Sequence, residues 1–140
     1  MDKQSKLDKL NQMSAQTLME TLEIKFSDVG EGFIEATMPV TSKVHQPYGI
    51  LHGGASIALA ETVGSVLSAT SIDPKEFKSV GMQMTSNHLR PKREGIIKAR
   101  AEFVKKGRTV HLVKIEIKDE EGQMICYCHL TNSIVPNNYV

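Results

Sequence analysis

Hydrophobic residues between Gly53 and Ser71 recur on nearly every side of a helix. The group comprises Ala55, Ile57, Ala58, Leu59, Ala60, Val63, Val66, Leu67 and Ala69. A helix that is apolar all round is usually a buried one. The pattern therefore predicts a long, buried helix near the centre of the fold.

The chain after this helix has the pattern of four long strands. They cover residues 79–90, 96–104, 109–118 and 124–135, with Gly95, Gly107 and Gly122 between them. The run Asp119-Glu120-Glu121-Gly122 predicts a hairpin turn between the last two strands. One buried helix followed by four strands favours an α+β fold, in which an antiparallel sheet wraps around the helix.

The first third of the chain is less regular. Residues 1–21 predict one or two short amphipathic helices, with Leu7 and Leu10 near helical spacing. Residues 33–38 have the pattern of a strand, and the proline and glycine within residues 42–51 indicate a loop. We expect the 140 residues to form a single domain, in which residues 1–21 are an N-terminal helical extension.

A single sheet leaves one face and two edges without a partner. Unpaired edge strands are templates for pairing with other chains, and proteins usually cover them. Most homo-oligomers are symmetric, and two-fold dimers are the commonest. We therefore expect at least a homodimer, and a tetramer made of two such dimers.

The charge balance excludes the strongly basic class of nucleic-acid-binding proteins. Lys and Arg total 17 against 16 Asp and Glu, which gives a net charge of +1. No segment has the apolar length of a membrane span, and the N-terminal run MDKQSKLDKLNQM lacks the apolar centre of a signal peptide. We expect a cytoplasmic protein that binds neither nucleic acid nor membrane.

Cys126 and Cys128 are the only two cysteines. Alternate residues of a strand share a face, so the pair could meet a metal ion. Metal sites usually need further Cys or His ligands at suitable spacing, which favours the interpretation of two small apolar residues in a reducing compartment. We expect no metal and no cofactor.

The residues that point to chemistry begin where the buried helix starts, at His52, Gly53 and Gly54. Glycines let a ligand approach the backbone closely. The first N–H groups of a helix lack intrahelical partners and favour negative charge. Such a helix start can stabilise an oxyanion. The alternative is a glycine-rich turn that His52 only caps.

Glu61 is the only ionisable residue of this helix. An unpaired carboxylate in a buried helix is costly, so its presence needs a reason. The alternative to a functional role is that Glu61 bonds a backbone group or the hydroxyl of Ser65. Glu61 lies eight residues beyond Gly53, or about 12 Å along the helix axis. If both act on one carbonyl group, they come from two subunits, and the active site lies at a dimer interface.

The run GILHGGASIALAETVGS, residues 49–65, resembles the signature of hotdog-fold acyl-CoA thioesterases with a catalytic Glu on the central helix. The runs EATMPV, SNHLRPKREG and IEIKDEEG extend the resemblance, which covers residues 22–135. It is closest to the PaaI-like group that contains 1,4-dihydroxy-2-naphthoyl-CoA hydrolases of menaquinone biosynthesis and the enterobactin proofreading thioesterase. The resemblance implies an acyl-CoA thioesterase acting on an aromatic or other acyl group.

Carried over by position, the resemblance gives each catalytic residue a role. Glu61 would be the nucleophile or general base, and the Gly53 N–H would polarise the thioester carbonyl. His52 and Gln46 would orient that carbonyl and assist the departing thiolate. Ser65 would help to hold the hydrolytic water.

The resemblance also implies residues that bind the substrate. His88 and Arg90 would bind the phosphates of CoA from one face of their strand, and Lys106 and Arg108 are candidates for the same task. A solvated sheet edge is the alternative for these basic residues. Met82, together with Met84, would line an adaptable acyl pocket, since methionine is pliable.

Two other functions are compatible with a hotdog fold. One is a hydratase or dehydratase acting on acyl thioesters, although the HGG run followed by Glu61 favours hydrolysis. The other is a non-catalytic acyl-CoA sensor, which would not need the glutamate.

Overall fold

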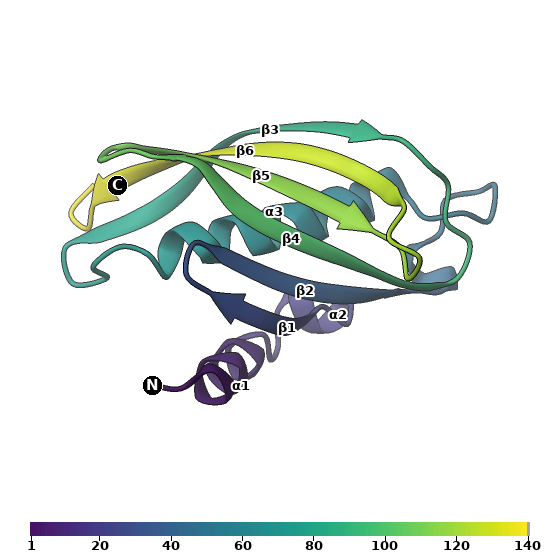
Figure 1. Ribbon diagram of the computed structural model, residues 1–140, viewed down its shortest axis with the longest axis horizontal. Helices are drawn as coiled ribbons and strands as arrows, with labels where there is room; N and C mark the ends of the chain where they lie inside the picture. Colours follow the sequence, from purple (N-terminus) through teal and green to yellow (C-terminus); the bar gives the residue numbers. More distant parts are fainter. Residues whose placement is uncertain (140) are drawn as a thin grey trace.

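The computed structural model describes residues 1–139 and has an α+β architecture (Figure 1). Its elements are α1 (Lys3–Met13), α2 (Leu18–Thr21), β1 (Lys25–Gly30), β2 (Phe33–Val40), the 3₁₀ helix η1 (Ser42–Val44), α3 (Gly53–Ala69), β3 (Phe77–His88), β4 (Gly95–Lys106), β5 (Val110–Lys118) and β6 (Met124–Pro136). The six strands form one antiparallel sheet in the order β1-β2-β4-β5-β6-β3. The predicted sheet around a central helix is confirmed.

The core lies between the concave face of the sheet and α3 (Figure 1). Alternate residues of the strands point toward the helix, as Ile34 and Ala36 do on β2 and Val113 and Ile115 on β5. Gly64 brings α3 close to the sheet, because a Cβ at this position would lie 2.8 Å from Leu130 Cδ2. The tight approach of helix and sheet thus depends on a small residue in the middle of α3.

The prediction that α3 is buried on all sides is wrong. Its buried residues lie on the side that faces the sheet: Ser56, Leu59, Ala60, Val63, Gly64, Leu67 and Ser68. On the other side Glu61 is exposed, and Ala58, Thr62 and Ser65 are half-buried. Apolar residues such as Ala58 and Val66 also lie on this side but are only half-buried, so the apolar pattern around the helix does not correspond to burial. The burial of Glu61 that the sequence pattern predicts is therefore not observed among residues 1–139.

The strands differ from the sequence prediction most clearly at β1 and at the end of β3. β1 was not predicted, because only Phe26 of its six residues is buried and the strand has no clear alternation. β3 ends at His88, so Arg90 lies beyond the strand and does not share a strand face with His88. The predicted hairpin turn before β6 is confirmed: Gly122 has φ 81° and donates its N–H to Asp119 O at 3.0 Å.

The β1 edge of the sheet is covered by the chain itself, whereas the β3 edge is open. α1 packs beside β1, where the Asn11 side chain accepts from Phe26 N at 2.9 Å and donates to Phe26 O at 3.1 Å. Asn11 thus bonds both backbone groups of Phe26 on the outer edge of β1. At the opposite edge β3 pairs with β6 on one side and, within residues 1–139, with no strand on its outer side, and Val80 and Met82 are 42% and 64% exposed.

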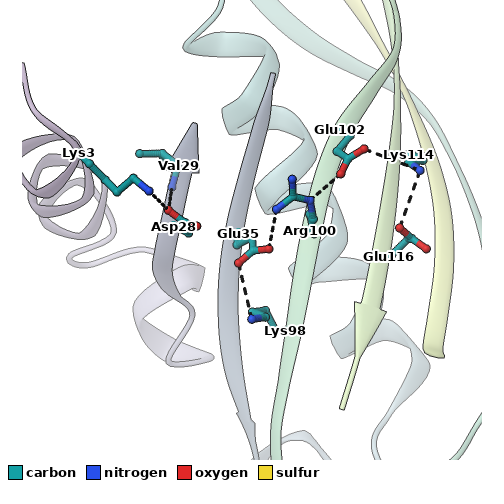
Figure 2. Close-up of polar contacts among 9 residues, drawn as sticks. All are labelled: Lys3, Asp28, Val29, Glu35, Lys98, Arg100, Glu102, Lys114 and Glu116. Carbon is teal, nitrogen blue, oxygen red and sulfur yellow. Dashed lines mark hydrogen bonds and ion pairs between the residues drawn. The ribbon is translucent and has the colours of Figure 1, made fainter. Parts of the chain in front are cut away.

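The convex face of the sheet carries a row of alternating charges (Figure 2). Arg100 on β4 bonds Glu35 of β2 at 2.9 Å and Glu102 of its own strand at 2.6 Å, and Lys114 of β5 lies 3.8 Å from Glu102. Partly exposed ion pairs of this kind contribute only ~0–1 kcal/mol each. Because its side chains are charged and partly exposed, this face of the sheet is not part of the core.

No helix within residues 1–139 is long and apolar enough to cross a membrane.

Candidate active site

The start of α3 has one backbone donor that the chain leaves free. His52 is the N-cap, and its Nδ1 accepts a hydrogen bond from Gly54 N–H at 2.8 Å. Capping by His52, the alternative raised from the sequence, is thus observed. Within residues 1–139 the N–H of Gly53 has no hydrogen-bond partner. Capping uses the Gly54 donor, and the Gly53 donor stays available to a ligand.

His88, at the end of β3, covers this helix start. A Cβ on Gly53 would lie 3.0 Å from Cε1 and Nε2 of the His88 ring. The other ring nitrogen, Nδ1, is 3.6 Å from Cys126 Sγ. The exposed imidazole of His88 therefore packs against Gly53 at the start of α3.

Gln46 belongs to the loop that leads into α3. Its backbone N–H donates to Ile50 O at 2.8 Å, and its side-chain Oε1 accepts from Tyr48 N–H. His52 N–H donates to Val44 O at 2.8 Å, which ties the end of the loop to η1. The loop that carries Gln46 and His52 is thus held by its own hydrogen bonds, with Gly49 at φ 74° completing the turn.

Glu61 occupies the middle of α3, well separated from Gly53. Its carboxylate has no hydrogen bond and no ion pair within the described residues. The alternative in which Ser65 or a backbone group satisfies Glu61 is therefore not observed. A Cβ on Gly81 of β3 would lie 3.1 Å from Glu61 Oε1, so the carboxylate lies against the backbone of the edge strand.

A hollow of about 470 Å³ opens beside Glu61 on the exposed side of α3. Its walls are Ala58, Glu61, Thr62, Ser65 and Val66 of α3, and Thr17, Leu18 and Met19 of the N-terminal segment. Glu61 is the only charged residue among them. Sequence reasoning placed Ser65 here but missed Leu18 and Met19. The only feature of the sequence that could have indicated them is that these two large apolar residues lie among mainly polar residues of the N-terminal segment.

The remaining predicted residues lie at two ends of the molecule. Arg90 follows His88 at the end of β3 near the start of α3. Lys106 ends β4 opposite His111, which contacts Ser68 at the other end of α3, and Arg108 lies in the turn after Lys106. One chain thus does not bring the two basic pairs together.

The two predicted methionines differ in their surroundings. Met82 is exposed and does not line the hollow, whereas Met84 is half-buried and packs against the core. In the single chain, Met84 therefore has a packing role, and Met82 lies on the open edge of the sheet.

His111 and Cys126 are two buried, titratable side chains of the sheet. Burial, with the nearby Lys106 charge, lowers the pKa of His111, and a Ser68 hydroxyl lies 3.0 Å from its Nδ1. The hydrogen bond between the Cys126 and Cys128 sulfurs, together with burial, raises the pKa of the Cys126 thiol. A buried thiol of raised pKa is a poor nucleophile. Within residues 1–139 no cluster of three or more His, Cys, Asp or Glu could hold a metal ion.

Comparison with known proteins decides the family. The model of the family described as "Thioesterase superfamily" matches residues 48–126, which include the helix start, all of α3 and most of the sheet. The chain belongs to the thioesterase superfamily. Gly53 and Glu61 of this thioesterase both lie within the matched residues.

The sequence of this thioesterase aligns with those of its relatives over nearly its whole length. It is 39% identical over 129 residues to 1,4-dihydroxy-2-naphthoyl-CoA hydrolase of Escherichia coli, covering 92% of this chain and 93% of that protein. It is 36% identical to the proofreading thioesterase EntH of Cronobacter turicensis, again covering 92% and 93%. A crystal structure of a thioesterase from Haemophilus influenzae superposes with a TM-score of 0.91 at 40% identity, covering 95% and 92%. The expected hotdog fold and thioester hydrolase activity are confirmed.

Proposed function

We propose that this thioesterase hydrolyses an acyl-CoA with an aromatic or other apolar acyl group, and that Glu61 is its catalytic carboxylate. The observation that carries the proposal is the unpaired Glu61 carboxylate, the only charge on the wall of an otherwise apolar and hydroxyl-lined hollow. The hollow is the place for the acyl group. The Escherichia coli relative acts, by its name, on 1,4-dihydroxy-2-naphthoyl-CoA, which makes that compound and a role in menaquinone biosynthesis the first candidates.

The chemistry needs no group beyond these side chains and water. The Gly53 N–H binds the carbonyl oxygen and stabilises its negative charge as the carbonyl carbon is attacked. Glu61 either attacks that carbon, forming an anhydride that water then cleaves, or removes a proton from the attacking water. The C–S bond breaks, and the thiolate takes up a proton to leave as free CoA. His52 and Gln46 orient the carbonyl, and Ser65 holds the water.

A homodimer supplies the geometry that one chain lacks. Gly53 and Glu61 stand at different places along the rigid helix α3, and the edge strand β3 is open for pairing. A partner that pairs antiparallel along β3 would bring the start of its α3 toward Glu61. It would also bring Lys106 and Arg108 of one chain toward the end of β3 at His88 in the other chain.

We further propose that two dimers form a tetramer. We also propose that residues 1–140 are one domain and that the protein is cytoplasmic.

Mixed dimers test whether the site is shared. One subunit carries Glu61→Gln and the other Gly53→Pro, with different affinity tags for purification of the mixed species. Because one of the two sites then has both intact groups, we expect the mixed dimer to have about half of the wild-type activity, as symmetry requires. Each variant alone should be nearly inactive. A mixed dimer as inactive as its parents would contradict a shared site.

Arg90 is proposed to bind the phosphates of CoA. Replacement by alanine removes a charge-assisted hydrogen bond at an exposed position, so we expect KM to rise about fivefold to tenfold while kcat changes little. Initial rates over a range of acyl-CoA concentrations measure this, with Arg93→Ala, three residues on, as the matched control. The same loss in both variants would indicate a general effect of surface charge instead.

A panel of thioesters tests the proposed substrate class. We expect free thiol from aromatic acyl-CoAs at kcat/KM values at least about tenfold above those of acetyl-CoA, because the hollow buries the larger acyl group. Thiol release is followed with a colorimetric reagent, and acyl carrier protein thioesters are run in parallel. Preference for the carrier-protein substrate, or equal rates for acetyl and aromatic groups, would overturn the proposed specificity.

A further inference from the structure

The edge strand β3 has an irregularity directly opposite Glu61. Gly81 pairs with Asn132 of β6, but the next pair is Gln83 with Thr131, so Met82 is an extra residue in a β-bulge. Bulges often occur next to active sites, where they redirect the chain. The backbone φ of Gly81 lies outside the left-handed region. The bulge itself therefore does not require glycine at this position.

The carboxylate of Glu61 gives a reason for the glycine. A Cβ at Gly81 would lie 3.1 Å from Glu61 Oε1 and 3.8 Å from Asn132 Oδ1, and apart from the adjacent residues of β3 no other atom of residues 1–139 lies within 4 Å. A contact of 3.1 Å is closer than carbon and oxygen atoms normally pack. An alanine would therefore push on the Glu61 carboxylate and on little else.

Asn132 presents an acceptor to the same space. Its side chain is fully buried, and Nδ2 donates to Ser68 Oγ at 2.8 Å and to Gly64 O at 3.3 Å. Because the Gly64 carbonyl can only accept, the orientation of the amide is fixed. Oδ1 then faces Gly81 and has no hydrogen-bond partner among residues 1–139. A buried amide oxygen without a donor is rare and needs an explanation.

We propose that Gly81 and Asn132 are positioning residues for Glu61. The bare backbone of Gly81 leaves a notch for the Glu61 carboxylate, and Asn132 Oδ1 bounds this notch. Both oxygens are acceptors, so the Asn132 oxygen limits how far the Glu61 carboxylate can move into the notch. Ser68, which also contacts His111 at 3.0 Å, fixes the amide from behind. The inference rests on the catalytic role proposed for Glu61.

Gly81→Ala tests the notch. We expect kcat to fall about 10- to 100-fold, because small displacements of a catalytic group have effects of this size, with KM changed less than about twofold for the same reason. The melting temperature should stay equal or rise slightly, since alanine at a compatible φ lowers the entropy of the unfolded chain. A glycine needed only for folding would give the opposite result, a lower melting temperature with unchanged kcat. Size-exclusion chromatography with light scattering checks that the oligomer is retained, and Val80→Ala on the same strand is the control.

A double-mutant cycle separates contact with Glu61 from other effects. In the Glu61→Asp background the shorter carboxylate does not reach the added methyl, so Gly81→Ala should cost about tenfold less in kcat than it does in the wild-type background. Equal costs in the two backgrounds would overturn the proposal, whatever the melting temperature.

Asn132→Leu removes the amide oxygen at similar volume, and Ser68→Ala removes only the support behind the amide. We expect Asn132→Leu to lower kcat about tenfold, and Ser68→Ala to lower the melting temperature with a smaller change in kcat. Equal kcat values for Asn132→Leu and the wild type would remove Asn132 from the proposal. An inactive Glu61→Gln variant beside fully active Gly81→Ala would reject the notch alone, whereas an active Glu61→Gln variant would reject the proposed function.

Discussion

Replacement of Glu61 by glutamine is expected to lower kcat by about a thousandfold or more, because an amide can neither attack the carbonyl nor accept a proton. The substitution is nearly isosteric. Glu61 is exposed and forms no ion pair with the residues that the structure describes, so the free energy of unfolding should change by less than about 0.5 kcal/mol. Thiol release under single-turnover and steady-state conditions measures the loss, and thermal melting measures the stability.

Glu121→Gln provides the control for this variant. Glu121 is exposed in the turn before β6, and its side chain forms no hydrogen bond or ion pair among residues 1–139. It should have wild-type activity. If Glu61→Gln also released thiol at a near-normal rate, the carboxylate would not take part in the reaction.

Removal of the Gly53 N–H is expected to lower kcat by about a hundredfold, the usual cost of one oxyanion donor. Proline removes this hydrogen, and it is well tolerated at the first position of a helix. The preceding residue, His52, already has φ −68° and ψ 130°, which is the conformation that a residue before proline adopts. Gly53→Pro should therefore fold normally.

Gly53→Ala is the matched control for the proline variant. Both substitutions add a Cβ that lies 3.0 Å from the His88 ring, but alanine keeps the N–H. The ratio of their kcat values thus reports the hydrogen bond itself. Steady-state kinetics of the two variants at saturating acyl-CoA gives this ratio. Equal kcat values would show that the Gly53 N–H does not bind the oxyanion.

Much of the fold could be predicted because hydrophobic periodicity is a local signal. The helix 53–69, the four long strands and the turn at Gly122 all follow from residues close together in the chain. The exposure of Glu61 could not be predicted in this way. Its neighbours Ala58, Thr62 and Ser65 are small enough to suit either a buried or an uncovered side of the helix.

The candidate site could be predicted only where its residues are close in sequence. His52, Gly53 and Glu61 belong to one segment and share one helix, so spacing alone relates them. The contact of Gly81 with Glu61 and Asn132 depends on β3 pairing with β6, with two strands between them in the chain. Hydropathy does not specify which strands pair, and it cannot separate Met84 in the core from Met82 on the edge.

The hydrogen bonds from Asn11 to Phe26 limit how far this sheet can grow. With the β1 side occupied by its own chain, the sheet can be extended by strand addition only at β3. Two copies joined there use up the one available side of each, so the assembly is finite and cannot continue into a fibre. Asn11 and the helix α1 that carries it thus oppose strand addition at the β1 edge of the sheet.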